Sequence, residues 1–170
     1  MGIRYIIYCR HSSNKMMNES VQLKKAKRTT ELYLRALWGK GFALYQAESV
    51  DQSVKAISYI VNDHIYLSQQ VSSGHYAQYY FRAAAVHAAL HLLHRDVTLE
   101  FSSFNLMQRS MIGLVEDLRI ELKAIRRFPG LRKLWLNFHQ DSRLLTAENA
   151  ESLMLRLSRS VLDPSYRDSH

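Results

Sequence analysis

The sequence predicts an α+β fold that is mostly helical. Two long segments predict helices: residues 75–94 are rich in alanine, which has a high helix propensity, and residues 103–127 repeat apolar residues with the period of a helix. Before them, residues 42–68 contain short β-branched and aromatic runs separated by turn residues, which is typical of a small hairpin or sheet. An N-terminal helical segment and shorter C-terminal helical segments flank these regions, so we expect helices to dominate one layered core.

The first helix is predicted from about Glu19 to Gly39. Gly39 and Gly41 are natural stop signals. Residues 1–17 do not share the helical period and match the rest of the chain poorly, so we expect one helix-rich domain over 18–168. The expected apolar stripe, with the lysines facing outward, consists of Val21, Ala26, Leu32, Leu34, Leu37 and Trp38.

The predicted strands lie at 42–45, 56–61 and 65–67. Asn62, Asp63 and His64 separate the second strand from the third and supply turn residues. A β-hairpin is therefore the expected local structure.

The two long helices should form the centre of the core. The first opens after the Ser72-Ser73-Gly74 segment and is rich in alanine, which favours helix and lets another backbone approach closely. In the second helix, Glu121 falls inside the apolar stripe, Asp117 at its edge and Glu116 on the opposite side. That stripe consists of Phe104, Met107, Met111, Leu114, Leu118, Leu122 and Ile125.

Pro129 and Gly130 should end the second long helix. A short amphipathic helix is predicted over 131–139. A last helix is predicted over 146–162, where residues 146–149 (TAEN) resemble a helix start.

Composition limits the class of protein. The 170-residue chain has a single cysteine, Cys9, which excludes an internal disulfide and favours a reducing compartment. No apolar run approaches the roughly 18 residues of a membrane span, so we expect a cytoplasmic protein without membrane insertion. The net charge is +8, but the basic residues are dispersed, which makes a nucleic-acid-binding regulator the weakest alternative.

Three histidines share one face of the first long helix. His87, His91 and His94 are spaced i, i+4 and i+7. His-x-x-x-His is the zinc-binding half of the His-Glu-x-x-His motif, and a hairpin followed by two long helices is similar to a minimal zincin core. Position 88, however, is alanine, where the general base would be glutamate, so peptide hydrolysis by that route is not expected.

The second long helix could supply acids opposite these histidines. One interpretation is a zinc site formed by His87, His91, Glu121 and Glu116. The alternative, which needs no cofactor, is a buried ionic and hydrogen-bond network. Its members would be His87, His91, His94, Asp117, Glu121 and Arg119.

A third feature lies around the rigid Pro129-Gly130 turn, where charged residues alternate with large apolar ones. This pattern suits docking to another protein, with an aromatic anchor. The alternative is that Trp135 and Phe138 complete the core. The candidate contact residues are Arg126, Arg127, Arg132, Lys133 and Trp135.

An ordered set of motifs over roughly 55–168 resembles the N-terminal region of the nitric oxide reductase activation protein family (NorD-type), which includes the rubisco-activation proteins (CbbO-type). The motifs are 82–92 (RAAAVHAALHL), 114–121 (LVEDLRIE), 128–135 (FPGLRKLW) and 162–168 (LDPSYRD).

This resemblance implies a non-catalytic adaptor or scaffold domain. In such proteins the region precedes a von Willebrand factor A domain and works with a MoxR-type AAA+ ATPase to activate or remodel a target enzyme such as nitric oxide reductase or rubisco. No Asp-x-Ser-x-Ser metal site follows the motifs here, so we expect the domain without its A domain. The implied partners are the ATPase, the target enzyme complex and a separate A-domain polypeptide.

Overall fold

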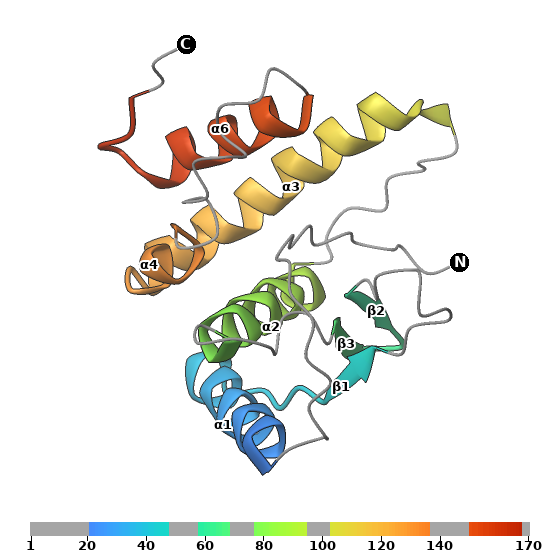
Figure 1. Cartoon of the computed structure of the whole chain (residues 1–170), viewed down its shortest axis with the longest axis vertical. Coiled ribbons are helices and arrows are strands. Elements are labelled where there is room, and N and C mark those ends of the chain that lie inside the picture. Colours follow the sequence, from blue (N-terminus) through green and yellow to red (C-terminus); the bar gives the residue numbers. More distant parts are fainter. Residues whose placement is uncertain (1–20, 48–57, 69–76, 95–102, 137–149, 168–170) are drawn as a thin grey trace. The chain divides into compact units, whose positions relative to one another are not determined.

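The computed structural model describes residues 21–47, 58–68, 77–94, 103–136 and 150–167 (Figure 1). Two compact units divide the chain, Met1–Leu93 and His94–His170, and each is described by itself. Helices predominate among the described residues, together with one small sheet, which confirms the predicted α+β, mostly helical class. The single domain over 18–168 stays a prediction.

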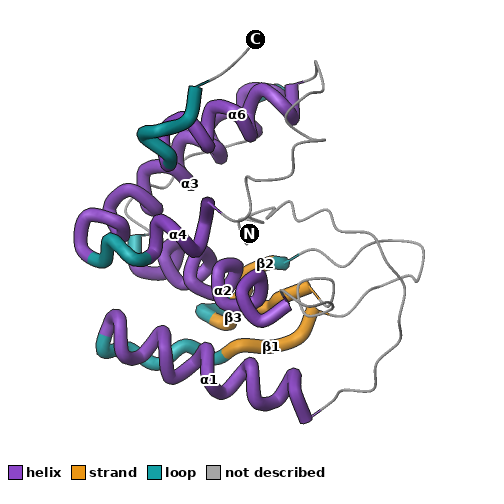
Figure 2. The backbone as a smooth tube through the Cα atoms, turned by 60° about the vertical axis from the view of Figure 1, so that its left-hand side comes forward, coloured by secondary structure: helices purple, strands orange, loops and turns teal. Residues whose placement is uncertain are grey.

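The first unit consists of two helices and a three-stranded sheet. Its elements are α1 (Val21–Trp38), β1 (Leu44–Ala47), β2 (Tyr59–Val61), β3 (His64–Ser68) and α2 (Ala77–Leu93). The strand order is β1-β3-β2, with β1 parallel and β2 antiparallel to β3. Helix α2 contacts both α1 and β3, and Figure 2 shows the two helices beside the sheet.

The described elements agree with the predicted ones to within a few residues. The first predicted strand, 42–45, is shifted toward the C-terminus to Leu44–Ala47. The second and third correspond to β2 and β3, although residues 56 and 57 lie outside the described residues. The first long helix corresponds to α2 over its described part.

Helix α1 ends as predicted, but its buried face differs from the predicted stripe. Gly39 follows the helix with φ +69°, and its N–H donates to the Arg35 carbonyl. Thr30 and Leu34, four residues apart, are buried, whereas Leu32 is 60% exposed. Leu32 lies two residues from each of them, which places it on the opposite side of the helix. Its assignment to the buried stripe was wrong.

The predicted hairpin joins β2 and β3 through a two-residue turn. Both turn residues have positive φ, +48° at Asn62 and +63° at Asp63. This is the backbone of a type I′ turn, whose twist matches that of the paired strands. The Nδ1 atom of His64 donates to the Asn62 carbonyl at 2.8 Å and closes the turn.

Replacing Asn62 by valine should destabilise this hairpin by about 1–2 kcal/mol, because a β-branched residue tolerates positive φ poorly. Asn62→Gly is the matched control, since glycine adopts this backbone without strain. Thermal unfolding of both variants measures the difference. Equal stability of the valine and glycine variants would mean that the turn does not keep its positive φ.

The two faces of the sheet have different side chains. Leu44, Ile60, Ile65 and Leu67 are buried. On the other face, Tyr66 of the central strand stacks on Tyr45 at 5.3 Å and on Tyr59 at 4.7 Å between ring centroids. Such cross-strand aromatic pairs stabilise a sheet and fix its register.

Helix α2 is buried around its whole circumference over residues 83–91. Five of these nine residues are alanines, each at most 3% exposed. Small side chains on every side let neighbouring groups pack close to the helix backbone. The alanine-rich segment is thus part of the core, as its composition predicts.

The second unit contains three described helices, α3 (Leu106–Arg127), α4 (Leu131–Leu136) and α6 (Ala150–Leu162). Each of them contacts the other two. The guanidinium of Arg132 in α4 donates to the Leu162 carbonyl at the end of α6. These helices lie within the predicted ranges, whereas residues 137–149, with Phe138 and the predicted helix start at 146–149, lie outside the described residues.

Local signals define both ends of α3. The Asn105 side chain accepts a hydrogen bond from the Gln108 N–H, and the Gln108 side chain accepts one from the Asn105 N–H. This reciprocal pair is a capping box. At the other end the Phe128 N–H donates to the Ala124 carbonyl, and Pro129 follows as predicted.

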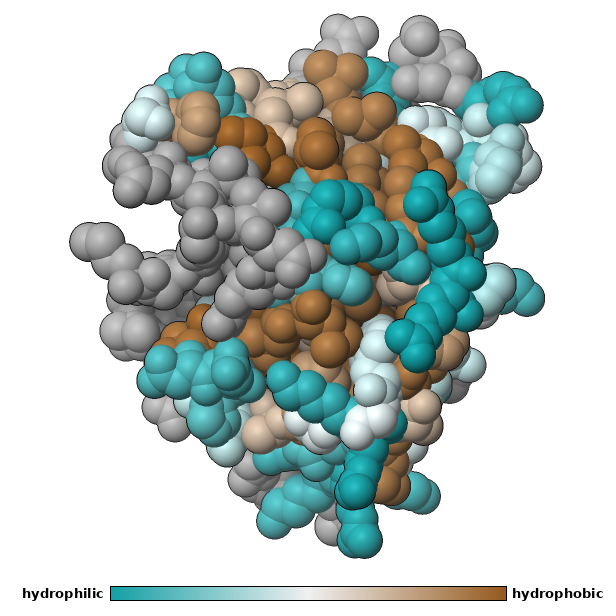
Figure 3. All heavy atoms as spheres, turned by 180° about the vertical axis from the view of Figure 1, so that it is seen from behind, coloured by the Kyte–Doolittle hydropathy of each residue, from teal (hydrophilic) through white to brown (hydrophobic). Residues whose placement is uncertain are grey.

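The buried face of α3 is confined to its C-terminal half. Leu118 and Ile125 of the predicted stripe are buried, but Met107 is 53% and Met111 40% exposed. Figure 3 shows apolar surface among polar residues in the upper region, where α3 and α6 lie. Burial of the stripe's first turns was therefore a wrong prediction. Residues buried in this helix are Leu118, Ile120, Glu121, Ala124 and Ile125.

The segment after α6 forms a tight turn. The Tyr166 N–H donates to the Asp163 carbonyl. The Asp163 carboxylate accepts hydrogen bonds from the Ser165 hydroxyl and N–H. These bonds favour the ionised form and lower the pKa of Asp163 below its usual value.

Candidate functional site

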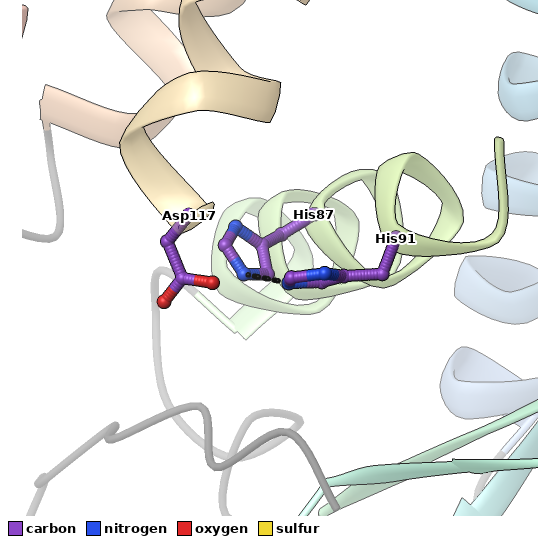
Figure 4. A group of neighbouring side chains, drawn as sticks. All are labelled: His87, His91 and Asp117. Carbon is purple, nitrogen blue, oxygen red and sulfur yellow. Dashed lines mark hydrogen bonds between the residues drawn. The ribbon is translucent and has the colours of Figure 1, made fainter. Parts of the chain in front are cut away.

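Two of the predicted histidines face each other on α2 (Figure 4). The Nε2 atoms of His87 and His91 are 3.1 Å apart, and the ring planes are inclined by 70°. The i, i+4 spacing produces this arrangement, because residues four apart are neighbours on one helix face. Both side chains are buried, at 8% and 3% exposure.

A contact between two Nε2 atoms restricts the protonation of the pair. One imidazole must donate through its Nε2–H and the other must accept through its Nε2 lone pair. Two protonated Nε2 atoms at this distance would place two donors against each other. The pair therefore presents two converging nitrogens that share one proton. A cation could take the place of that proton if the donating ring carries it on Nδ1 instead.

Ala88, the residue that follows His87, is small and buried. Ala88 is 3% exposed. A zinc hydrolase of the His-Glu-x-x-His type needs a carboxylate at this position to take a proton from metal-bound water. The motif therefore retains its two imidazoles without that acid.

His94 lies at a different kind of position from the other two histidines. Helix α2 ends at Leu93, one residue earlier than predicted. His94 belongs to the second unit, and its backbone carbonyl accepts a hydrogen bond from the Arg119 guanidinium.

Glu116 and Arg119 form a local ion pair on α3. Arg119 donates through Nε and Nη2 to the two carboxylate oxygens of Glu116, both at 2.6 Å. The Glu116 side chain is 24% exposed and the Arg119 side chain 33% exposed. Because both oxygens of Glu116 already accept from one guanidinium, Glu116 is a weaker candidate for a metal ligand than its sequence position suggests.

The other two acids of α3 are less exposed to solvent. Glu121 is only 7% exposed, as its place in the apolar stripe predicts, and Asp117 is half-buried. A buried carboxylate needs compensation by a charge, a hydrogen bond or a cation. The predicted contacts of Asp117 and Glu121 with the histidines would join the two units, and they stay predictions.

Most of the predicted contact residues around the α3–α4 turn are exposed. Arg126, Arg127 and Lys133 form what we call the basic corner, at the end of α3 and in α4. The Arg127 guanidinium lies 5.3 Å from the centre of the Phe128 ring. Arg132 is half-buried and bonded to α6, so it contributes more to the fold of this unit than to its surface.

Trp135 belongs to the core of its unit. It is 3% exposed, which is the core alternative left open by the sequence. An aromatic anchor for a partner has to be accessible, so Trp135 is removed from the candidate contact residues.

Sequence reasoning named both histidines but expected acids as their partners. The direct imidazole–imidazole contact could have been inferred from the i, i+4 spacing alone. The stacked tyrosines were not singled out, because their common face depends on strand register. Alternation along a single strand does not define that register.

No protein-family model, curated protein or solved structure matches this chain. Within the described ranges, no helix combines the length and apolar character needed to cross a membrane.

Proposed function

We propose that this chain is a non-catalytic adaptor or scaffold domain that works in the cytoplasm with a MoxR-type AAA+ ATPase and an A-domain polypeptide. In this role the domain holds a target enzyme, such as nitric oxide reductase or rubisco, while the ATPase supplies the work of activation. The proposal starts from the ordered motifs of the NorD-type and CbbO-type families, three of which include residues of the candidate site.

The observation that carries the proposal is the basic corner. Arg126, Arg127 and Lys133 expose three positive charges around one rigid turn. Such a group fits an acidic surface on a protein partner, where it would raise the rate of association and select the orientation. The Arg132 hydrogen bond to α6 holds α4 in place, so Lys133 is presented from a fixed backbone.

The composition of the histidine motif supports a non-catalytic role. The methyl group of Ala88 cannot act as a general base. Because Ala88 is buried, there is little room beside it for another side chain to act as the base. The domain would then contribute binding, and the chemistry would be left to the ATPase and the target.

The basic corner can be tested by charge reversal. Arg126→Glu combined with Arg127→Glu should weaken binding to a MoxR-type ATPase of the same genome, with the A-domain polypeptide present, by about tenfold or more. Surface plasmon resonance at two salt concentrations measures the affinity, and binding of the unmodified chain should weaken with salt.

The matched control is Lys24→Glu combined with Lys25→Glu, which reverses two exposed charges on α1. This control should bind as the unmodified chain does. The proposal is contradicted if the unmodified chain does not bind the ATPase and A-domain pair. Equal loss in both double variants would mean that net charge, and not the basic corner, determines binding.

A further inference from the structure

We propose that His87 and His91 together bind a divalent transition-metal ion, with zinc as the best fit, in a site without hydrolytic activity. This inference concerns α2 alone and is independent of the adaptor proposal. It rests on the distance between two nitrogens, on their burial and on the side chains that surround them in sequence.

The distance suits chelation. A tetrahedral zinc ion holds imidazole nitrogens at about 2.0–2.1 Å, which places two such nitrogens about 3.3–3.4 Å apart. The two Nε2 atoms are 3.1 Å apart without any ion. The pair is therefore only about 0.2–0.3 Å closer than chelation requires, and a rotation of the rings that opens this separation would direct both lone pairs at one ion.

The protonation of the pair also suits a metal. Zinc binds the neutral imidazole through the lone pair of one ring nitrogen, while the other ring nitrogen carries the proton. The present hydrogen bond already requires one Nε2 lone pair. A tautomer change in the donating ring, which moves its proton from Nε2 to Nδ1, gives both Nε2 atoms a lone pair for the ion.

Burial separates this pair from two histidines placed together by chance. The other residues of the 83–91 stretch are alanine, valine or leucine, all buried. An apolar residue would fill each histidine position without the cost of burying an imidazole. Two buried imidazoles whose Nε2 atoms lie 3.1 Å apart form a preassembled pair of nitrogen ligands.

The chemistry of the donors selects the ion. Imidazole nitrogen suits zinc, copper and nickel, whereas calcium and magnesium prefer oxygen. Two protein nitrogens leave further coordination positions for water or other ligands. Because Ala88 supplies no general base, an ion held here would be structural or regulatory.

The experiment uses the full chain, purified without a histidine tag and freed of metal by a chelator. Zinc alone is titrated calorimetrically, and cobalt(II) is added in parallel because its visible absorption reports tetrahedral nitrogen ligation. We expect one ion per chain and a higher melting temperature with zinc. His91→Gln and, separately, His87→Gln should each weaken zinc binding by about 100-fold.

His64→Gln is the control, because it removes an imidazole from β3 that is not part of the pair. It should bind zinc as the unmodified chain does. Circular dichroism of the metal-free variants shows whether each one folds. The proposal is overturned if the folded, unmodified chain binds no zinc at 100-fold molar excess, or if both folded glutamine variants bind zinc as tightly as the control.

Discussion

Replacing Glu121 by alanine is expected to lower the free energy of unfolding by about 3–5 kcal/mol. The side chain is 7% exposed, among Leu118, Ala124 and Ile125 on the buried face of α3. A carboxylate in such surroundings is held by compensating groups, and its removal leaves them buried without their counter-charge. Urea unfolding followed by circular dichroism measures the loss.

Glu116→Gln is the matched control on the same helix. This residue pairs with Arg119 at partial exposure, where an ion pair contributes about 0–1 kcal/mol. The control should therefore lose far less stability than Glu121→Ala. A loss below about 0.5 kcal/mol in Glu121→Ala would show that the carboxylate is solvated in solution and that α3 buries a different face.

Introducing glutamate at position 88 is expected to destabilise the protein by about 3 kcal/mol or more, although it completes the His-Glu-x-x-His pattern. Ala88 is 3% exposed and lies in the stretch of α2 that is buried on all sides. The larger side chain would overpack this region and carry a charge into it. Thermal and urea unfolding of Ala88→Glu measure the effect.

Ala36→Glu is the matched control, since Ala36 is an exposed helical alanine in the same unit. Ala36→Glu should lower the free energy of unfolding by a few tenths of a kcal/mol, which is roughly the difference in helix propensity between alanine and glutamate. If Ala88→Glu is as stable as this control, position 88 opens to solvent. Burial would then not be what keeps a larger side chain out of position 88.

The elements of the fold were predictable because their signals are local. Gly39 ends α1, Asn62 and Asp63 make the turn of the hairpin, and Pro129 follows α3. Each of these residues acts through its own backbone preference, whatever the rest of the chain does. Helix and strand ranges accordingly agree with the structure to within a few residues in the described part of the chain.

The faces that these elements bury were harder to predict. Leu32, Met107 and Met111 continue apolar stripes, yet all three are exposed. An apolar period indicates which side chains gain from burial, whereas burial itself requires a partner surface from another element. The buried Trp135 illustrates the opposite case, because its sequence pattern suited a surface anchor equally well.

The sequence predicted which residue types would make up the candidate site better than it predicted which of them would be in contact. The spacing of His87 and His91 placed them on one face, and the apolar stripe placed Glu121 inside it. Glu116 was assigned to the metal, but its carboxylate is engaged by Arg119, which lies only three residues away. Competition from such a near neighbour is visible only when side-chain geometry is known.

The reciprocal hydrogen bonds at Asn105 and Gln108 satisfy backbone N–H groups at the exposed end of α3. Residues 106–111 are all exposed, so burial contributes little to the stability of these first turns. The capping box therefore stabilises an end of the helix that packing does not. Its removal is expected to fray the first turn while the buried C-terminal half of α3 keeps its place.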